Sequence, residues 1–267
     1  MEICLIGCGK MGGALLAGWQ QDSRLEASFM VVDPFVTAAS DQPKTTYSAS
    51  VSGLPAGYHP DLVILAVKPQ MMADVLGTLS GLGDQTTCFL SIAAGLSTAR
   101  LSAQLGRPVR WLRAMPNTPA AIGQGVSALY AAPDVPDEMA VLCRHLLSAV
   151  GDVVDLPDEG VMNAVTALSG SGPAYVFLLA ETMAAAGQAL GLPAGLAARL
   201  ARQTVSGAGA LMAAEAETGA DQLRRNVTSE GGTTAAALSV LMADDGLQPL
   251  FDRALRAAEQ RGAELDS

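Results

Sequence analysis

The sequence contains few of the side chains that usually carry acid and base chemistry or bind metals. It has two histidines, His59 and His145, and only three lysines, and residues 151–267 contain neither type. The four cysteines form no CxxC pair, so we expect buried free thiols rather than a metal site or a disulfide. A mechanism in the second half of the chain must therefore work without a histidine or a lysine.

The chain also lacks an excess of positive charge and a long uncharged apolar run. It carries 16 lysine and arginine residues against 26 aspartate and glutamate residues, a net charge of −10. Such a surface argues against a nucleic acid or an anionic membrane as partner. The longest apolar-rich segment, residues 173–190, is interrupted by polar residues and predicts a buried helix rather than a membrane span. The N-terminus lacks the pattern of a secretory signal, which predicts a cytoplasmic protein.

What the sequence does contain is apolar residues in a regular order. Half of the residues are apolar and 16% are charged, which is typical of a globular protein with a substantial core. Up to about residue 156, short runs that are apolar throughout alternate with segments of helical length. This pattern predicts an α/β fold, a mainly parallel, doubly wound sheet with helices on both faces. The runs are 3–6, 29–32, 62–67, 88–92, 109–114, 126–131 and 153–156.

A glycine-rich motif follows directly on the first run. Three glycines fit the pattern G-x-G-x-x-G between a predicted strand at 2–6 and a predicted helix at 14–20. The first permits a tight turn, the second lets the backbone approach a pyrophosphate, and the third lets the helix pack on the strand. We expect the pyrophosphate of a nicotinamide dinucleotide to bind at the start of this helix, on Ile6, Gly7, Gly9, Lys10, Met11 and Gly12.

Asp33 stands at the end of the second run, about 20 residues beyond the last glycine of the motif. An acidic side chain at this place accepts hydrogen bonds from the adenosine ribose and disfavours a 2′-phosphate, so Asp33 favours NADH over NADPH. The alternative is that Asp33, which precedes Pro34, only caps a turn.

Two further segments close predicted strands at the carboxyl edge of the sheet, where ligands of open α/β folds bind. One ends the run 62–67, and the other carries Thr118 between two prolines after the run 109–114. A solvated surface lysine and a purely structural turn are the alternatives. We expect cofactor contacts from Ala66, Val67, Lys68, Pro69 and Asn117, and Lys68 is also a catalytic candidate.

The character of the sequence changes after the polar segment 157–160. Beyond it come alanine- and leucine-rich stretches of helical length without a strand pattern. We therefore expect a Rossmann-type dinucleotide-binding domain at 1–156 and an all-helical domain at 157–267. Small residues recur on the predicted helices, and this half is too apolar to cover itself, which predicts a homodimer built through the helical domain.

Two polar, glycine-rich segments interrupt these predicted helices, residues 166–175 and 227–234. Each offers hydroxyl groups and uncommitted backbone N–H groups at a helix start, which suits a carboxylate, although ordinary helix capping is the alternative. Oxidation of an alcohol needs a base, whereas a protonated cyclic imine can accept hydride with positioning and anion binding alone. The residues present therefore favour reduction of an imine.

At these motifs the chain resembles the pyrroline-5-carboxylate reductase family over essentially its full length. The resemblance rests on residues 7–12, 66–69, 115–119, 166–175 and 227–234. It implies an oxidoreductase acting on CH–NH groups, which reduces L-1-pyrroline-5-carboxylate to L-proline with NADH or NADPH in the final step of proline biosynthesis. It also implies a helical dimerisation domain, often assembled into a larger ring of dimers.

The resemblance further implies how the second polar segment binds substrate. The substrate carboxylate would lie on the backbone of Gly231, Gly232 and Thr233, and Ser229 would lend its hydroxyl. Thr234 would hydrogen-bond the ring nitrogen and is the catalytic candidate of this segment.

One position departs from the family pattern, because Glu230 stands where the family usually has proline. This loop is therefore less rigid and carries a negative charge near an anion site, and we expect the side chain to face solvent. Two other interpretations stay open. One is a β-hydroxyacid dehydrogenase, which would need a lysine that the helical half lacks, and the other is a dinucleotide-binding regulatory protein without turnover.

Overall fold

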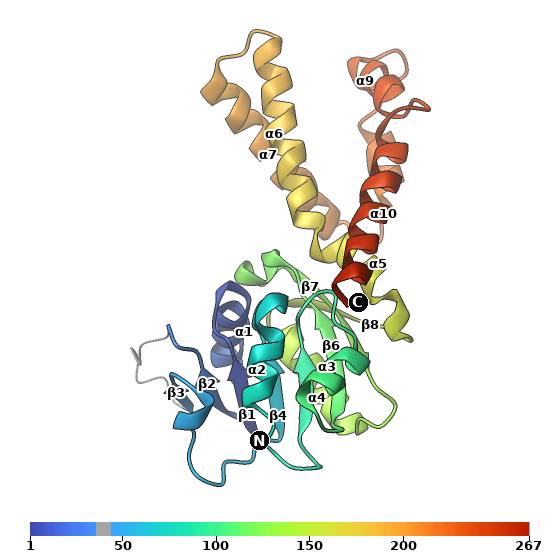
Figure 1. Ribbon diagram of the computed structural model, residues 1–267. Helices are drawn as coiled ribbons and strands as arrows, with labels where there is room; N and C mark the ends of the chain where they lie inside the picture. The colour runs from blue at the N-terminus through green and yellow to red at the C-terminus, as the bar shows by residue number, and fades with distance from the viewer. Residues whose placement is uncertain (36–43, 267) are drawn as a thin grey trace. The chain divides into compact units, whose positions relative to one another are not determined.

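The computed structural model describes residues 1–35 and 44–266 (Figure 1). Compactness divides the chain into two units, which are described separately here: unit 1, Met1–Ser171 with Ala258–Ser267, and unit 2, Gly172–Ala257. The last strand of the sheet ends at Asp155, yet compactness keeps the chain up to Ser171 with the sheet. The domain boundary after residue 156 stays a prediction.

Unit 1 is built on one sheet of eight strands in the order β3-β2-β1-β4-β5-β6-β7-β8. Neighbouring strands are parallel except β6 and β7, which run antiparallel. The mainly parallel sheet of the prediction is thereby confirmed. Its strands are β1 (Glu2–Ile6), β2 (Ser28–Val32), β3 (Thr45–Ser48), β4 (Leu62–Leu65), β5 (Cys88–Ser91), β6 (Arg110–Met115), β7 (Gly125–Ala131) and β8 (Gly151–Asp155).

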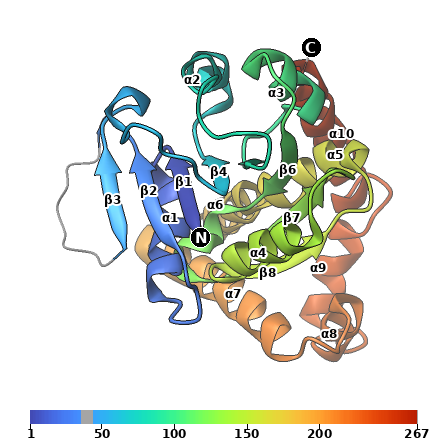
Figure 2. The same cartoon turned by 90° about the horizontal axis from the view of Figure 1, so that it is seen from below.

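Helices cover both faces of this sheet, as Figure 2 shows. They are α1 (Lys10–Gln21), α2 (Met72–Thr78), α3 (Thr98–Leu105) and α4 (Asp137–Ser148). α1 and α4 pack on one face, and α2 and α3 pack on the other. Ile3 and Leu5 of β1 enter the first core, whereas Cys4 and Ile6 enter the second. Because both faces are buried, each central strand must be apolar throughout, and this is why the sequence pattern located it.

Each of the seven predicted runs corresponds to a strand, but β3 has no counterpart among them. β3 is a four-residue edge strand, and none of its residues is buried in the chain as described. An edge strand of this kind needs no continuous apolar run. Its residues, Thr-Thr-Tyr-Ser, therefore form no apolar run from which a strand could be predicted.

Short helical segments connect the sheet to the rest of unit 1. They are η1 (Val51–Gly53), η2 (Pro69–Met71), η3 (Thr118–Ile122), η4 (Glu159–Val161), α5 (Met162–Val165) and the π-helical turn η5 (Thr166–Gly170). The Thr166 hydroxyl donates a hydrogen bond to the carbonyl oxygen of Met162, 2.8 Å away. The first polar segment of the helical half thus begins as a π-helical turn, a feature often found at functional sites.

Unit 2 consists of helices alone. They are α6 (Gly172–Ala189), α7 (Ala194–Ala214), α8 (Ala220–Asn226), α9 (Thr233–Leu241) and most of α10 (Leu247–Asp266), whose last turns belong to unit 1. α6 and α7 form a helical hairpin (Figure 1), and a Cβ atom on Gly187 of α6 would lie 3.4 Å from the Cβ of Ala197 of α7. Small residues therefore allow close packing of the hairpin.

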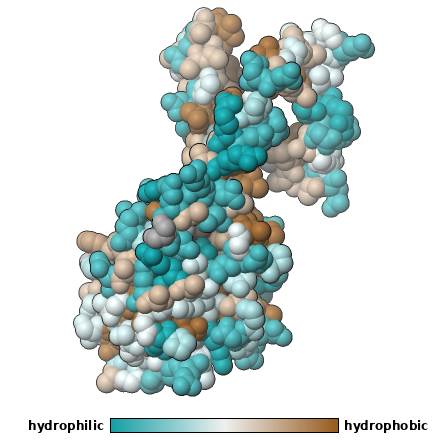
Figure 3. All heavy atoms as spheres, turned by 45° about the vertical axis from the view of Figure 1, so that its right-hand side comes forward, coloured by the Kyte–Doolittle hydropathy of each residue, from teal (hydrophilic) through white to brown (hydrophobic). Residues whose placement is uncertain are grey.

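The apolar character of unit 2 lies largely on its surface. α6 is helical as predicted, but none of its residues is buried in the single described chain, and Phe177 is 67% exposed. Figure 3 shows apolar residues, in brown, on the surface of the helical part. Among the described residues, no helix is long and apolar enough to cross a membrane. The expectation that residues 173–190 form a buried helix therefore does not hold for one chain by itself.

Candidate active site

The turn between β1 and α1 is built around three glycines with different tasks. Gly7 has a φ of +93°, and a Cβ atom there would lie 2.8 Å from Cγ1 of Val67. A Cβ atom on Gly12 would overlap the carbonyl oxygen of Gly7. Around a Cβ built on Gly9, by contrast, no described atom lies within 4 Å. The protein's own packing requires glycine at the first and third positions, and only Gly9 borders open space.

The start of α1 is open to an anion. Among the residues described, no side chain caps this helix start, and the first turn holds no acidic residue. The first N–H groups of a helix carry the positive end of its dipole, and phosphate groups bind well at such a place. Lys10 and Met11 are the first two residues of α1. The residues present thus fit the pyrophosphate of a dinucleotide.

The carboxylate of Asp33 lies against the same turn. Its Oδ2 accepts a hydrogen bond of 2.6 Å from the backbone N–H of Cys8, and its Oδ1 accepts one of 2.8 Å from the N–H of Phe35. The second bond caps the turn at Pro34, and the first fixes a negative charge beside the glycine turn. Burial, together with this nearby carboxylate, raises the pKa of the Cys8 thiol. A 2′-phosphate placed here would meet a fixed anion.

The segment after β4 also reaches the glycine turn. The N–H of Ala66 donates to the carbonyl oxygen of Ile6 at 2.8 Å, and Val67 packs beside Gly7. Pro69 begins η2, and Lys68 precedes it with an exposed side chain. Within the described part of the chain, Lys68 makes no ion pair. The structure therefore brings Ala66 and Val67 to the predicted dinucleotide turn and leaves the cation of Lys68 available.

Asn117 is committed to the protein through both ends of its side-chain amide. Its Oδ1 accepts a hydrogen bond of 3.0 Å from the N–H of Val126, and its Nδ2 donates one of 3.4 Å to the carbonyl oxygen of Ser169. These bonds tie the loop after β6 to the start of β7 and to the π-helical turn η5. A cofactor contact from Asn117 stays a prediction, and its structural role is the one that the geometry displays.

The loop after β5 was not singled out from the sequence, although it lies at the same edge of the sheet. β4 and β5 are parallel neighbours, and the N–H of Ile92 donates to the carbonyl oxygen of Leu65 at 3.1 Å. Gly95 in this loop has a φ of +68°. The loop follows the last residue of an apolar run and carries no charged group, so no polar motif marks it in the sequence. A glycine just after a predicted strand was the available signal.

In unit 2, the loop before α9 resembles the glycine turn of unit 1. Gly231 has a φ of +70°, and no described atom lies within 4 Å of a Cβ built on it. Gly232 is the N-cap of α9, whose start has neither a side-chain cap nor an acidic residue in its first turn within the described chain. A Cβ atom on Gly232 would meet the hydroxyl of Ser229. Thr233 and Thr234 are the first two residues of the helix.

These observations define a class of protein. A mainly parallel sheet, a glycine turn leading into an open helix start, and a helical C-terminal part are typical of a Rossmann-type oxidoreductase that uses a nicotinamide dinucleotide. Residues 2–95 match the family model described as NADP oxidoreductase, coenzyme F420-dependent. Residues 159–265 match the model described as pyrroline-5-carboxylate reductase dimerisation.

Individual relatives narrow this class. The chain is 42% identical to a pyrroline-5-carboxylate reductase of Pseudomonas aeruginosa, over 99% of this chain and 96% of the relative. It is similar to the solved structure of a pyrroline-5-carboxylate reductase from Coxiella burnetii, with a TM-score of 0.85, 34% identity and coverage of 99% of this chain and 98% of the other. A structure from Plasmodium falciparum with NADP bound gives a TM-score of 0.82 at 26% identity and covers 100% of this chain and 98% of that one. The chain belongs to the pyrroline-5-carboxylate reductase family.

Proposed function

We propose that the turn after β1 and the loop before α9 are the cofactor-binding and substrate-binding segments with which this chain reduces L-1-pyrroline-5-carboxylate to L-proline. This proposal rests on a feature that the two segments share. α1 and α9 each start on a glycine, without a side-chain cap or an acidic residue in the first turn of the described chain. A pyrophosphate and a carboxylate are both anions that such a helix start binds.

On the cofactor side, the backbone from Ile6 to Gly12, including Lys10 and Met11, holds the pyrophosphate. The fixed carboxylate of Asp33 accepts hydrogen bonds from the adenosine ribose and favours NADH. The other contacts come from the carboxyl edge of the sheet, namely Ala66, Val67, Lys68, Pro69 and Asn117. Lys68 is exposed and free of ion pairs within the described residues, so its charge can meet an anionic cofactor, and it stays a catalytic candidate.

On the substrate side, the backbone of Gly231, Gly232 and Thr233 and the hydroxyl of Ser229 hold the carboxylate. The hydroxyl of Thr234 hydrogen-bonds the ring nitrogen and keeps the imine carbon in position. When bound, the reduced nicotinamide supplies a hydride to that carbon, while the ring nitrogen retains its proton and becomes an amine. The protein then needs only to bind and orient the substrate. Residues 151–267 contain no histidine or lysine that could act as an acid or a base.

An assay of dinucleotide oxidation tests the proposed function. Absorbance at the nicotinamide band is followed with L-1-pyrroline-5-carboxylate, with NADH and NADPH in separate runs, and with hydroxy acids as control substrates. We expect turnover with the cyclic imine alone. Turnover with hydroxy acids would favour a β-hydroxyacid dehydrogenase, and dinucleotide binding without any turnover would favour a regulatory protein.

The role of Thr234 is tested by Thr234→Ala. Loss of a hydrogen bond to a charged group costs about 1.5–3 kcal/mol, so we expect kcat to fall by roughly 10- to 100-fold with the fold intact by circular dichroism. Ser239→Ala is the matched control, because among the described residues the Ser239 hydroxyl, on the same helix, donates only to the carbonyl oxygen of Ala236. Unchanged kcat and KM in the Thr234 variant would remove the assigned role.

We further propose that unit 2 forms a homodimer in the cytoplasm and that dimers join into a larger ring. Exposed apolar side chains on α6 of the single chain, among them Val176, Phe177 and Leu178, support burial of this helix against a second copy. Light scattering after gel filtration gives the mass of the assembly. A monomeric mass at micromolar protein concentration would contradict the dimer, and a mass of two chains would contradict the ring.

A further inference from the structure

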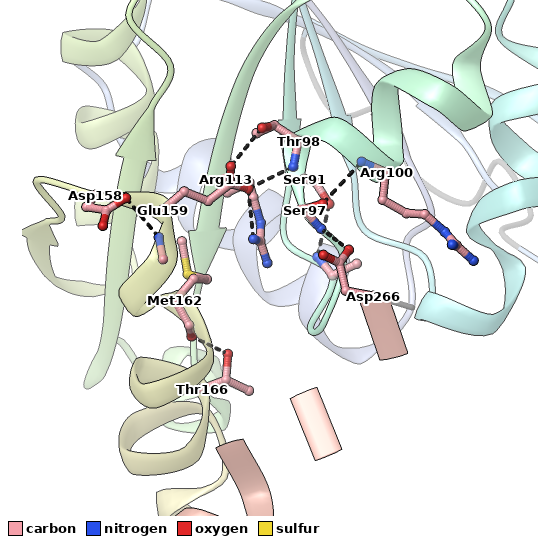
Figure 4. Close-up of polar contacts among 12 residues, drawn as sticks. Ser91, Ser97, Thr98, Arg100, Arg113, Asp158, Glu159, Met162, Thr166 and Asp266 are labelled. Carbon is pink, nitrogen blue, oxygen red and sulfur yellow. Dashed lines mark hydrogen bonds and ion pairs between the residues drawn. The ribbon is translucent and has the colours of Figure 1, made fainter. Parts of the chain in front are cut away.

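A polar cluster in unit 1 lies at the start of α3 and takes no part in the proposed binding of cofactor or substrate. It surrounds a cavity of 320 Å³, and the residues lining this cavity include Ser97, Arg113, Glu159 and Asp266 (Figure 4). These four residues come from four separate parts of the chain: the loop after β5, strand β6, the segment after β8 and the end of α10. The cluster therefore joins segments that are far apart in sequence.

Two carboxylates from outside the helix accept hydrogen bonds from the N–H groups at the start of α3. The N–H of Ser97 donates to Oδ1 of Asp266 at 2.7 Å. The N–H of Thr98 donates to Oε1 of Glu159 at 2.7 Å, and the Thr98 hydroxyl donates to Oε2 of the same side chain at 2.7 Å. Hydrogen bonds from helix-start N–H groups to carboxylates are among the stronger ones in proteins. Figure 4 shows both acidic side chains directed at this one helix start.

Glu159 is also the partner of a buried cation. Nη1 of Arg113 lies 2.9 Å from its Oε1, and the Arg113 side chain is 5% exposed. Nε and Nη2 of Arg113 have no hydrogen-bond partner among the described residues. A buried guanidinium needs a neutralising partner, so the position of Glu159 is fixed by Arg113 as well as by Thr98.

Two glycines let the same segments approach closely. A Cβ atom on Gly95, in the loop after β5, would lie 2.7 Å from Cβ of Leu265 on α10. A Cβ atom on Gly262 of α10 would lie 2.9 Å from Oδ1 of Asn163 on α5. Side chains at either position would push these elements apart, so glycine is needed at both. We call the hydrogen bonds of Ser97 and Thr98 to Asp266 and Glu159, which this close packing allows, the fastening.

The two acidic residues of this cluster lie near the points where the chain passes between unit 1 and unit 2. Glu159 lies shortly before the chain leaves unit 1 at Ser171, and Asp266 lies shortly after it returns at Ala258. Both connections to unit 2 are therefore tied to the two residues that begin α3. Those residues follow the loop after β5, at the edge of the sheet where the reactive end of a dinucleotide binds in this kind of fold.

We propose that Glu159 and Asp266 are positioning residues for the reaction. They fasten the outgoing and the returning connection of the helical unit to the loop after β5, and Arg113 holds Glu159 in place. This inference rests on the proposed function, in which unit 1 binds the dinucleotide and unit 2 binds the substrate. Loosening either connection should then lower turnover while it leaves dinucleotide binding, a property of unit 1, unchanged.

The test uses three variants of the full-length chain: Asp266→Ala, Thr98→Val, and the double variant Arg113→Met with Glu159→Met, which also removes the acceptor for Thr98. The double variant removes both charges together, so no uncompensated buried cation remains. We expect kcat with L-1-pyrroline-5-carboxylate to fall by about 10- to 100-fold, the scale of a small misplacement of reacting groups. The Kd of NADH, from fluorescence titration, should stay within about twofold of the wild type because the fastening does not touch the glycine turn.

Two comparisons separate positioning from a general loss of structure. Asp266→Asn keeps an oxygen that can accept the hydrogen bond from Ser97 and should restore most of the kcat that Asp266→Ala loses. Asp158→Asn is the matched control, because within the described residues this neighbouring carboxylate accepts a hydrogen bond only from the N–H of Gly160, in its own turn, and the change should leave kcat unchanged. Hydrogen exchange at residues 97–100 should be faster in Asp266→Ala than in the wild type, a readout independent of activity.

Each result has a defined meaning. Wild-type kcat in Asp266→Ala and in the double variant would overturn the inference, and so would a loss of NADH affinity in proportion to kcat. Failure of Asp266→Asn to restore activity would also count against it. If the wild-type protein itself does not reduce the cyclic imine, the proposed function fails, and the exchange experiment still decides whether the fastening exists.

Discussion

The starts of α1 and α3 lie at the same edge of one sheet, but side chains accept hydrogen bonds from the first N–H groups of α3 and not from those of α1 within the described residues. α1 follows β1 and α3 follows β5, two strands that run in the same direction. At α3, the carboxylates of Glu159 and Asp266 accept N–H groups, and the Ser97 hydroxyl accepts a third from Arg100 at 3.1 Å. At α1, no side chain of the described residues does so. The two helices offer the same partial charge, and the difference is whether the protein supplies its own anion.

The largest expected effect comes from making α1 resemble α3. Gly9→Asp places a carboxylate at the N-cap of α1, where φ is −68° and no described atom would obstruct a Cβ. Aspartate is a slightly better N-cap than glycine, so the free energy of unfolding should be unchanged or rise by roughly a few tenths of a kcal/mol. Repulsion of the pyrophosphate should lower NADH affinity by about 100-fold or more, as measured by fluorescence titration.

Gly9→Asn is the control for this variant, because it adds a cap of the same size without a charge. We expect it to lose clearly less affinity than Gly9→Asp. Equal losses would show that Gly9 is needed for space rather than for an open, uncharged helix start. Full affinity in both variants would place the pyrophosphate elsewhere.

A smaller effect is expected at Asp33, whose carboxylate lies against the α1 turn. Asp33→Asn keeps oxygen and nitrogen atoms in place of the carboxylate, so an acceptor for the N–H of Cys8 remains while the charge is lost. We expect kcat/KM with NADPH to rise by about tenfold relative to NADH, because a 2′-phosphate no longer meets a negative charge. Steady-state rates with both cofactors measure the ratio. An unchanged ratio would leave Asp33 with its turn-capping role alone.

The rate at which the Cys8 thiol is alkylated shows whether a dinucleotide occupies the same turn, and this test needs no substitution. Burial, and then the Asp33 carboxylate, raises the pKa of its thiol, so little thiolate is present at pH 8 and alkylation should be slow and become faster as pH rises. Burial raises the pKa of Cys4 to about 12, and Cys88 and Cys143 are fully buried, so Cys8 should react first. We expect NADH to slow its alkylation several-fold, by about fivefold at saturation, as followed by mass spectrometry. Equal rates with and without NADH would place the dinucleotide away from Cys8.

The same comparison explains which parts of the molecule the sequence revealed. The glycine turn was found because its residues are adjacent in sequence and stand between an apolar run and a helix. The fastening at α3 was missed because Thr98 and Glu159 are 61 residues apart, and Ser97 and Asp266 are 169 apart. Neither acid carries a local motif, and a single sequence does not reveal contacts over such separations.

The burial of side chains shows a second limit of the same kind. Arg113 lies within the predicted apolar run 109–114, and it is the one charged residue among the buried residues of the described chain. An arginine inside a strand gave no indication of its partner, because that partner lies on the connection to another unit. Conversely, the apolar α6 was expected inside, and its surface is exposed in one chain because its pattern was set for contact with a second chain. Local periodicity predicts that a surface is buried. It does not predict whether another part of the same chain or a second chain covers that surface.

The smallest expected effect concerns α9, the second open helix start. Glu230 precedes its glycines with an exposed side chain, so its negative charge is largely screened by water and salt. Glu230→Gln should lower KM for L-1-pyrroline-5-carboxylate by about twofold at low salt and hardly at all at high salt, with KM for NADH unchanged. Glu230→Pro should give the same salt-dependent gain plus any benefit of a more rigid loop. If only the proline variant improves KM, rigidity rather than charge distinguishes this loop from its family pattern, and α9 binds the substrate carboxylate despite the nearby charge of Glu230.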